Sequence, residues 1–249
     1  MPTILITGAS SGLGLAFLKH YISTTESDTK IIALDITPPA PETLALSPGV
    51  QFFKADITNT TSLSTISSQF ANTPIHLLIH SAGIRGLVPE IVSSQKGNVA
   101  AAETYHVMDH NTMMRTFEVN SFGTFSVIKS FLPSLQLAAS SPRSEILPKV
   151  VVISSRMGSV SSNVTGGGYA YRASKAALNS VVKSFSIDAP DVVFLLLHPG
   201  RVETGLVEWK EEGAISVEES VVDCLKVIQS SGHDMSGKFV DRWGVEIGW

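Results

Sequence analysis

The sequence predicts a doubly wound α/β domain, in which a parallel sheet of about seven strands is flanked by helices. Two observations lead to this prediction. Short runs rich in β-branched and aliphatic residues alternate with longer stretches of helical spacing, which is the order of elements in a parallel sheet with helical crossovers. Most strand runs are also apolar on successive residues, as is typical of strands covered on both faces.

The expected strands and helices follow one another along the sequence. Strands are expected at residues 3–7, 30–35, 50–55, 75–81, 149–154, 192–198 and 237–241. Helices are expected at residues 13–22, 62–70, 109–137, 171–187 and 217–228. Because no internal repeat and no linker divides the chain, residues 1–249 are expected to form a single domain.

Two stretches do not fit the alternating pattern. Residues 37–49 are rich in proline and indicate a surface loop with room for one helical turn. Residues 84–107 include Ser-Ser-Gln-Lys-Gly and indicate a partly irregular segment. Long loops inside compact domains are often functional, and solvated insertions without a function are the alternative.

The composition excludes several classes of protein. Of the 249 residues, 43% are hydrophobic and 16% are charged, which excludes an intrinsically disordered chain. The 18 Lys and Arg against 22 Asp and Glu give a net charge of −4 without a basic run, so nucleic acid is not an expected partner. The single cysteine, Cys224, excludes an internal disulfide framework and a cysteine-cluster metal site, and no metal is expected.

The sequence gives no sign of export or of a membrane span. Residues 1–3 lead directly into a strand, without a basic segment or a small-residue cleavage site. Uninterrupted apolar runs such as residues 192–197 are far shorter than the roughly 20 residues of a membrane span. A cytoplasmic protein in a reducing compartment, with no membrane partner, is therefore expected.

A glycine-rich turn, Thr-Gly-Ala-Ser-Ser-Gly-Leu-Gly at residues 7–14, follows the first strand and opens the first helix. Gly8 permits a sharp exit from the strand, Gly12 lets a ligand approach the backbone, and Gly14 lets the helix pack closely on the sheet. The unpaired N–H groups at the helix start suit a pyrophosphate. The turn therefore predicts a dinucleotide site of the Rossmann type, and a tight turn without a ligand is the alternative.

Asp35 ends the second expected strand, 21 residues after Gly14. A carboxylate here can accept hydrogen bonds from the ribose hydroxyls of an adenosine and repels a 2′-phosphate. The next residues, Ile36-Thr37-Pro38, include no Lys or Arg. The sequence therefore favours NAD(H) over NADP(H), and an aspartate that only caps the next loop is the alternative.

Tyr171 and Lys175 are four residues apart at the start of a long helix, so their side chains are expected on one face. A free tyrosine has a pKa near ~10 and is a poor acid–base group at neutral pH. A neighbouring lysine stabilises the phenolate and lowers this pKa, which suits proton exchange with an alcohol or a carbonyl. Such pairs also occur by chance, but Ser154-Ser155 at the end of the preceding strand and the nucleotide turn strengthen the prediction.

Together these motifs resemble the short-chain dehydrogenase/reductase family over essentially the whole chain. The matching segments are residues 7–14 (TGxxxGxG), Asp56 with Ile57 after the third strand, Asn120 in Val-Asn-Ser-Phe-Gly, Ser155 followed by Arg-Met-Gly, Tyr171 with Lys175 (YxxxK), and residues 199–204 (PGxVxT). The stretches around Ser155 and Tyr171 look most like the C-factor and sniffer-like carbonyl reductase branch.

The resemblance implies an NAD(P)-dependent oxidoreductase that moves a hydride between nicotinamide and a ketone, an aldehyde or a secondary alcohol. It implies that Ser155 hydrogen-bonds the substrate oxygen and that Tyr171 exchanges its proton with the substrate. Lys175 would hold the nicotinamide ribose and lower the pKa of Tyr171, and Asn120 would seat a water that links Lys175 to solvent. The residues expected to bind the cofactor are Gly8, Ser10, Ser11, Gly12, Leu13, Gly14, Asp35, Asp56, Ile57, Ser81, Ala82, Gly83, Lys175, Pro199, Gly200, Val202 and Thr204. The alternatives are that Ser154 and Ser155 only form hydrogen bonds with backbone groups at the strand end and that Asn120 only bends a helix.

The chain departs from the family pattern after the fourth strand, where His80-Ser81-Ala82-Gly83 stands in place of Asn-Asn-Ala-Gly. His80 is expected to be a satisfied interior residue, because no second His or Cys lies at metal-ligand spacing. Ser155 precedes Tyr171 by 16 positions, more than is usual in the family, and the Ser- and Gly-rich segment 160–168 is expected to border the substrate. Asp35 also departs, because this branch more often has a basic residue near that point.

The family keeps its substrate lid at residues that correspond to 205–215. Here that segment is short and includes Glu208, Trp209, Lys210, Glu211 and Glu212. A short lid indicates an open site that admits substrates of varied size, and an ordinary exposed helix start is the alternative.

Three classes of function fit these residues: an oxidoreductase, an enzyme of non-redox chemistry such as an isomerase or lyase, and a nucleotide-sensing binding protein. The complete set of Ser155, Tyr171 and Lys175 favours an oxidoreductase with a small-molecule substrate. The helices at 109–137 and 171–187 carry apolar residues on more than one face, namely Phe117, Phe122, Phe125, Leu178, Val181, Val182 and Phe185. The corresponding helices pair across a two-fold axis in this family, so a homodimer or homotetramer is expected, and burial under the chain's own loops is the alternative.

Overall fold

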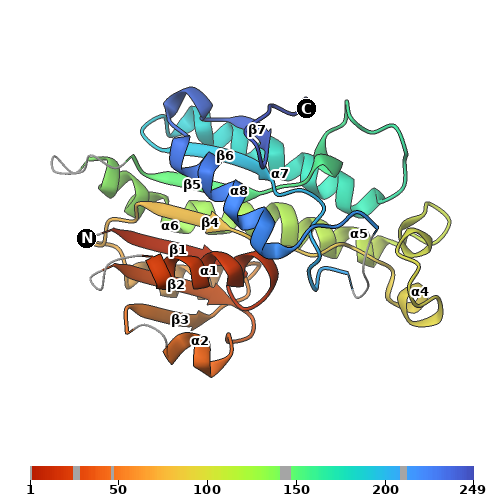
Figure 1. The fold of residues 1–249 in the computed structure, drawn as a ribbon, viewed down its shortest axis with the longest axis horizontal. Helices are drawn as coiled ribbons and strands as arrows, with labels where there is room; N and C mark the ends of the chain where they lie inside the picture. The colour runs from red at the N-terminus through yellow and green to blue at the C-terminus, as the bar shows by residue number, and fades with distance from the viewer. Residues whose placement is uncertain (1, 25–28, 46–47, 141–146, 208–211) are drawn as a thin grey trace.

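The structure, a computed structural model, describes residues 2–24, 29–45, 48–140, 147–207 and 212–249. In this part of the chain, seven parallel strands form a sheet in the order β3-β2-β1-β4-β5-β6-β7 (Figure 1). The strands are β1 (Thr3–Thr7), β2 (Lys30–Asp35), β3 (Val50–Lys54), β4 (Leu77–His80), β5 (Lys149–Ile153), β6 (Val193–His198) and β7 (Lys238–Asp241). Each strand begins and ends within two residues of its expected limits, and the predicted doubly wound α/β fold is confirmed.

The strand order creates a topological switch point between β1 and β4. From β1 the chain winds outward to β2 and β3, and it then returns to β4 and winds the other way to β7. Ligands of open α/β sheets bind at the carboxyl ends of the strands beside such a point. Here these ends are Thr7 of β1 and His80 of β4, which are paired in register.

Successive residues of the strands face two separate apolar cores. One core contains Leu5, Leu78, Val150, Val152 and Leu196, and the other contains Ile4, Ile6, Ile79, Val151 and Leu195. Because both faces of the sheet are covered, the strand sequences are apolar without alternation.

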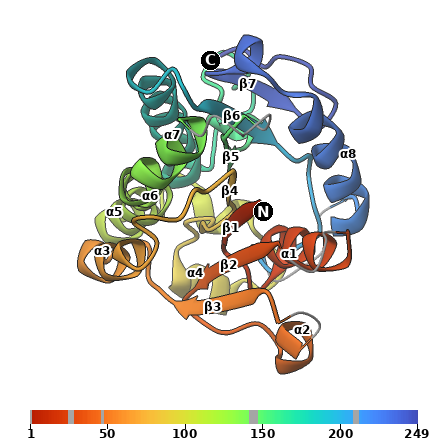
Figure 2. The same ribbon diagram turned by 90° about the vertical axis from the view of Figure 1, so that its left-hand side faces the viewer.

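Helices cover both faces of the sheet (Figure 2). One layer contains α1 (Gly12–Thr24) and α8 (Val217–Ser230), which contact each other. The opposite layer contains α3 (Thr60–Ser68), α5 (His110–Phe117), α6 (Thr124–Ala139) and α7 (Tyr169–Asp188). The α7 helix carries Tyr171 and Lys175 and contacts β6, so the sheet sets the position of both residues.

The helix expected at residues 109–137 is present and contains a π-helical turn. Between α5 and α6 lies a π-helical segment, η2 (Glu118–Gly123), and α6 continues through Pro133 to Ala139. The predicted helical stretch is therefore confirmed, and its middle turn is π-helical rather than α-helical. A π turn differs from an α turn by a single residue, which the apolar spacing does not reveal, and such turns are frequent at functional sites.

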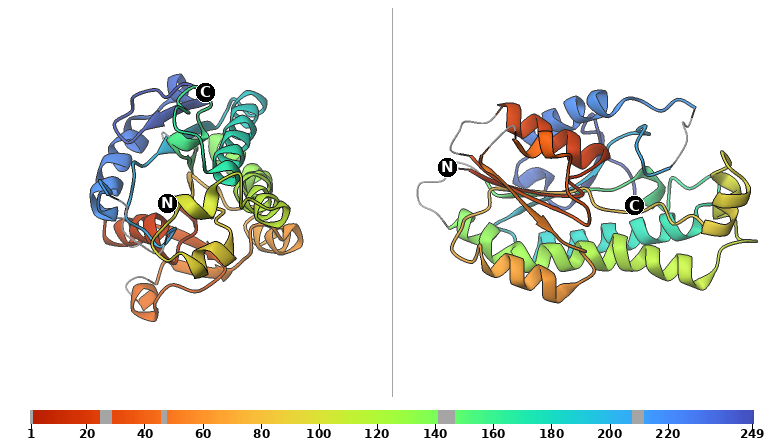
Figure 3. Two further views of the ribbon diagram at one scale, coloured as in Figure 1. Left: turned by 90° about the vertical axis from the view of Figure 1, so that its right-hand side faces the viewer. Right: turned by 90° about the horizontal axis from the view of Figure 1, so that it is seen from below.

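The two stretches that were expected to be irregular contain short helices. The proline-rich stretch contains α2 (Pro41–Ala45), and residues 46–47 lie outside the described part. The segment 84–107 contains α4 (Pro89–Ser94) and the 3-10 turn η1 (Ala100–Glu103). Figure 3 shows α4 beyond the sheet, at the end of the molecule that is opposite the N-terminus.

Candidate active site

A cleft of about 760 Å³ opens at the carboxyl ends of the strands. Most of the predicted site residues line it: Gly8, Ser11, Gly12, Leu13, Asp35, Asp56, Ile57, Ser81, Ala82, Gly83, Ser155, Tyr171, Lys175, Pro199, Gly200, Val202 and Thr204. Ser10, Gly14 and Asn120 are not part of the lining and instead support it. The fold therefore brings residues from position 8 to position 204 to one site.

The glycine-rich turn is packed too closely for side chains at two positions. A Cβ atom on Gly14 would lie 2.0 Å from the carbonyl oxygen of Gly8. Gly8 has a φ of +68°, and a Cβ atom there would lie 2.8 Å from the amide nitrogen of Ala82. Gly12 and Leu13, the first residues of α1, line the cleft, so the positive end of the helix dipole faces it.

Asp35 connects the end of β2 to the glycine-rich turn. Its Oδ2 accepts a hydrogen bond from the Ser10 amide at 2.9 Å, and its Oδ1 accepts one from the Ile36 amide at 2.6 Å. The hydroxyl of Ser10 donates to the carbonyl oxygen of Thr37. Asp35 therefore has the loop-capping contacts of the alternative interpretation, and it also lines the cleft.

Asp56 occupies the end of the cleft near β3. Its Oδ1 accepts hydrogen bonds from the amide and the hydroxyl of Thr58 at 2.9 and 2.7 Å, and Arg115 Nη2 lies 3.7 Å from its Oδ2. The Thr58 hydrogen bonds and, more weakly, the charge of Arg115 hold the pKa of Asp56 below its usual value. Asp56 is thus a carboxylate acceptor at neutral pH.

Tyr171 and Lys175 lie on the same face of α7, with only 7% and 4% of their surfaces exposed. The Nζ atom of Lys175 lies 5.8 Å from the centroid of the Tyr171 ring. It donates a hydrogen bond to the carbonyl oxygen of Ile153 at 2.9 Å, at the end of β5. Burial lowers the pKa of Lys175 to about 8. The phenol and the amine are neighbours, as their spacing predicted.

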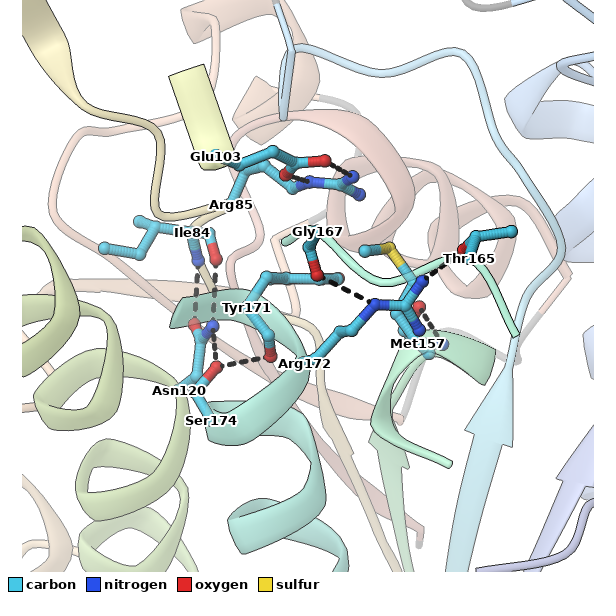
Figure 4. Close-up of polar contacts among 11 residues, drawn as sticks. Ile84, Arg85, Glu103, Asn120, Met157, Thr165, Gly167, Tyr171, Arg172 and Ser174 are labelled. Atoms are coloured by element: carbon cyan, nitrogen blue, oxygen red, sulfur yellow. Dashed lines mark hydrogen bonds and ion pairs between the residues drawn. The ribbon is translucent and has the colours of Figure 1, made fainter. Parts of the chain in front are cut away.

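Asn120 joins the segment after β4 to α7 (Figure 4). Its Oδ1 accepts a hydrogen bond from the Ile84 amide at 2.8 Å. Its Nδ2 donates to the Ile84 carbonyl oxygen at 2.8 Å and to Ser174 Oγ at 3.0 Å. The fully buried amide is thus engaged by protein atoms, and the water expected beside it stays a prediction.

The two serines after β5 have different surroundings. Ser154 is buried, and its hydroxyl donates to Asn179 Oδ1 at 2.6 Å. Ser155 precedes the 3-10 turn η3 (Arg156–Gly158), and its Oγ accepts a hydrogen bond from the Met157 amide at 3.2 Å. Because Ser155 is the acceptor in this contact, it keeps its own hydrogen for a group in the cleft.

His80 is a satisfied interior residue, as predicted. Its Nδ1 and Nε2 lie 2.8 Å from Thr7 Oγ1 and 2.9 Å from Thr124 Oγ1. Thr124 donates its hydroxyl hydrogen to the carbonyl oxygen of Asn120 at 2.6 Å, so the Nε2–H of His80 donates to Thr124 and Nδ1 accepts from Thr7. Burial, assisted by the charge of Lys175, lowers the pKa of His80 to about 3 and keeps the imidazole neutral.

Two loops lie at the cleft. From the segment 160–168, Ser162 lines the cleft, while Arg172 Nε donates to the carbonyl oxygen of Gly167 at 3.0 Å (Figure 4). From the segment 205–215, Gly205 and Leu206 line the cleft. The short lid was expected to include Glu208, Trp209, Lys210 and Glu211, and these four residues lie outside the described part of the chain.

The sequence did not single out Arg85 and Glu103, which contact this site. The guanidinium carbon of Arg85 lies 4.8 Å from the centroid of the Tyr171 ring. Arg85 Nε and Nη2 donate to the two carboxylate oxygens of Glu103 at 2.9 and 3.0 Å. These two residues are 18 positions apart in a segment without periodicity, so only the length of the segment hinted at a role.

Over the described ranges, no group of three or more His, Cys, Asp or Glu residues could hold a metal ion. In the same part of the chain, no helix has the length and apolar character needed to cross a membrane.

Known proteins resemble this chain in sequence and in fold. A family profile described as short chain dehydrogenase matches residues 2–214. The C-signal protein of Myxococcus xanthus is 37% identical over 178 residues, which are 71% of this chain and 93% of that protein. The NADPH-bound carbonyl reductase from chicken fatty liver is similar in structure, with a TM-score of 0.83 and 25% identity over 100% of this chain and 99% of that chain. The carbonyl reductase Sniffer of D. melanogaster has a TM-score of 0.83 and 24% identity over 100% of both chains.

Proposed function

This chain belongs to the short chain dehydrogenase family and is an NAD(P)-dependent oxidoreductase; we propose that it transfers a hydride between nicotinamide and a ketone, an aldehyde or a secondary alcohol. The observation that carries this proposal is that Tyr171, Lys175 and Ser155 line the same cleft as the glycine-rich turn. These groups supply a proton donor, a cation and a hydrogen-bond donor around one reacting oxygen.

The cleft residues fit a nicotinamide dinucleotide. The backbone around Gly8 and Gly14 leaves no space for side chains, and the start of α1 is directed at the cleft, which suits a pyrophosphate. Asp35, Asp56 with Ile57, and Ser81 with Ala82 and Gly83 would hold the adenosine half, and Lys175 with Pro199, Gly200, Val202 and Thr204 would hold the nicotinamide half. When bound, the cofactor supplies the hydride donor or acceptor.

Tyr171 exchanges the proton with the substrate oxygen in this proposal. A cation close to a phenol favours the phenolate, and the Lys175 ammonium is held 5.8 Å from the ring centroid by its hydrogen bond to Ile153. Because burial lowers the pKa of Lys175 to about 8, this ammonium gives up a proton more readily than an exposed lysine. It can therefore help to return a proton to Tyr171 after transfer.

Ser155 orients the substrate oxygen. Its Oγ is fixed by the hydrogen bond from the Met157 amide, which leaves the hydroxyl hydrogen for a carbonyl oxygen. A donor placed in advance stabilises the negative charge that develops on this oxygen during hydride transfer. Asn120 contributes by holding Ile84 and Ser174 beside the site.

We also propose that NAD(H) is preferred to NADP(H). Supporting this choice, Asp35 lies in the cleft wall at the end of β2, fixed by the amides of Ser10 and Ile36. A 2′-phosphate beside this carboxylate would bring two like charges together. The chicken liver carbonyl reductase binds NADPH, so cofactor preference would separate this chain from that relative.

We further propose that the chain is a homodimer or homotetramer. Phe122 and Phe125 are 45% and 37% exposed, although they belong to the helices that cover the sheet. The ring centroids of Phe125 and Phe185 are 5.7 Å apart, so aromatic side chains of two helices form one surface. Leu178 and Val182 are buried and cover the sheet. The surplus apolar face suits a second copy of the chain.

The remaining proposals concern the whole chain. We propose that residues 1–249 act as a single domain, since the strands form a sheet that is covered by helices along its length. We propose a cytoplasmic location because Cys224 is a free, buried thiol, which needs no oxidising compartment.

The experiment that tests the reaction is an assay of reduced nicotinamide absorbance with a panel of carbonyls and alcohols. Tyr171→Phe removes only a hydroxyl, so folding and NADH binding should be retained while turnover falls by about 10²–10⁴-fold. Lys175→Ala should lose turnover and also bind NADH more weakly. Normal turnover of Tyr171→Phe would make Tyr171 a packing residue and would contradict the proposed mechanism.

A further inference from the structure

The segment at residues 84–107 is anchored to the start of the helix that carries Tyr171. Within it, the Val88 amide donates a hydrogen bond to the carbonyl oxygen of Ala102 at 3.0 Å. The carbonyl oxygen of Glu103 accepts a hydrogen bond from the amide of Gly168 at 3.0 Å. Gly168 directly precedes α7, so this hydrogen bond ties the segment to the helix start.

The segment also places a buried ion pair against Tyr171. Figure 4 shows the Arg85 and Glu103 side chains lying together above Tyr171. Their side chains are only 13% and 11% exposed, and the guanidinium carbon of Arg85 lies 4.8 Å from the ring centroid. The two parallel hydrogen bonds from Arg85 to Glu103 hold the guanidinium in one orientation.

Two cations contact Tyr171, from different elements. Lys175 of α7 lies 5.8 Å from the ring centroid, and Arg85 lies 4.8 Å from it. Other charged groups on the surrounding elements have partners elsewhere. Arg156 of η3 pairs with Asp241, Arg115 of α5 pairs with Glu118, and Arg172 of α7 donates to Gly167 and Thr165. His80 is neutral, and burial lowers the pKa of His198 to about 4, so it is neutral as well.

We propose that Arg85 is a positioning residue for Tyr171 and that Glu103 limits how strongly the Arg85 charge acts on the phenol. The inference rests on the proposed role of Tyr171 as the proton donor. A guanidinium over an aromatic face fixes the ring by cation–π attraction, and a positive charge nearby favours the phenolate. The carboxylate of Glu103, paired with Arg85, acts in the opposite sense. The segment 84–107 thereby sets the pH at which Tyr171 loses its proton.

The test is a spectrophotometric titration of phenolate absorbance in the full chain. For each variant, the spectrum of the same variant carrying Tyr171→Phe is subtracted, which isolates Tyr171 from the other tyrosines. Arg85→Met should move the titration midpoint up by about 1 pH unit, and Glu103→Gln should move it down by about 0.5–1 unit. Arg85→Lys keeps the positive charge, so its midpoint should move up by less than half as much as that of Arg85→Met.

Matched controls remove the same charges from exposed residues that do not line the cleft. Lys226→Met and Glu218→Gln change exposed residues of α8 and should move the midpoint by less than about 0.2 unit, because water and salt screen exposed charges. If Arg85→Met does not fold, Arg85→Met combined with Glu103→Gln leaves no buried unpaired charge, and its midpoint should lie between those of the single variants.

The inference would be overturned if Arg85→Met and Glu103→Gln moved the midpoint in the same direction, or by no more than the controls. The ion pair would then only stabilise the fold of the segment. The titration reports on Tyr171 without turnover. Failure of the proposed reaction is recognised separately, by normal turnover of Tyr171→Phe.

Discussion

Substitution of Asn120 by alanine tests whether the site depends on the contact between η2 and the segment after β4. Asn120 satisfies both the amide and the carbonyl group of Ile84 and also donates to Ser174 Oγ. Alanine removes all three hydrogen bonds at a fully buried position. Ser174 still donates to the carbonyl oxygen of Tyr171 at 2.9 Å, so the main loss falls on Ile84.

The size of the effect follows from the groups that lose their partners. An unmade hydrogen bond of a buried polar group costs about 1–3 kcal/mol. Ile84 is half-buried and lines the cleft, so water can partly replace the side-chain amide of Asn120. The cost for the N–H group and for the carbonyl group of Ile84 should therefore each lie near the lower end of this range. With the lost contact to Ser174, Asn120→Ala should lower the free energy of unfolding by about 2–4 kcal/mol.

Asn120→Asp provides a sharper comparison. Aspartate can still accept from the Ile84 amide, but it places a carboxylate oxygen where Nδ2 lies 2.8 Å from the Ile84 carbonyl oxygen. Two acceptors would then face each other in a buried position, so Asp should destabilise the chain at least as much as Ala. An exposed residue of α5, Asn111, supplies the control, and Asn111→Ala should leave the stability unchanged.

The measurement is urea denaturation followed by circular dichroism, together with NADH binding by fluorescence. Asn120 variants that fold should bind NADH more weakly, because Ile84 continues the strand-end segment Ser81–Gly83 of the cleft wall. A loss of stability below about 1 kcal/mol for both substitutions would show that Ile84 finds other partners and that Asn120 does not hold the segment.

Three further predictions concern cofactor choice, acid stability and assembly. NADH should bind more tightly than NADPH by about 1–3 kcal/mol, and Asp35→Asn, which removes the charge but retains an acceptor for the Ser10 amide, should erode this preference in fluorescence titrations; tighter NADPH binding by the unsubstituted protein would refute it. The pKa of His80 is about 3 in the folded chain and 6.5 in its unperturbed state, so the unfolded chain takes up a proton first and stability falls as the pH falls between these values. His80→Asn should remove this contribution, which changes the free energy of unfolding by up to about 1.4 kcal/mol per pH unit, as measured by urea denaturation. Equal pH dependence in both proteins would contradict the burial of a neutral imidazole. Phe125→Glu should yield a monomer in light scattering at micromolar concentration, and a monomeric unsubstituted protein would disprove the proposed assembly.

The sequence alone determined the fold, the glycine-rich turn and the Tyr171–Lys175 pair because these depend on local patterns, and the family resemblance added most of the other residues that line the cleft. Runs rich in apolar residues located the seven strands, and the positions of Gly8, Gly12 and Gly14 identified the turn that only residues without a Cβ atom can form. The spacing of Tyr171 and Lys175 placed them on one helix face, since four residues complete about one helical turn.

Contacts between distant segments were decided only by the tertiary structure. The π turn at Asn120 is stabilised by its hydrogen bonds to Ile84, which lies 36 positions earlier, and no periodicity in the helix reveals this. Arg85 and Glu103 reach Tyr171 because the segment 84–107 folds back on the start of α7. Hydrogen bonds and ion pairs of this kind depend on the position of the backbone in space, whereas a local sequence pattern specifies only which face of a strand or helix is buried.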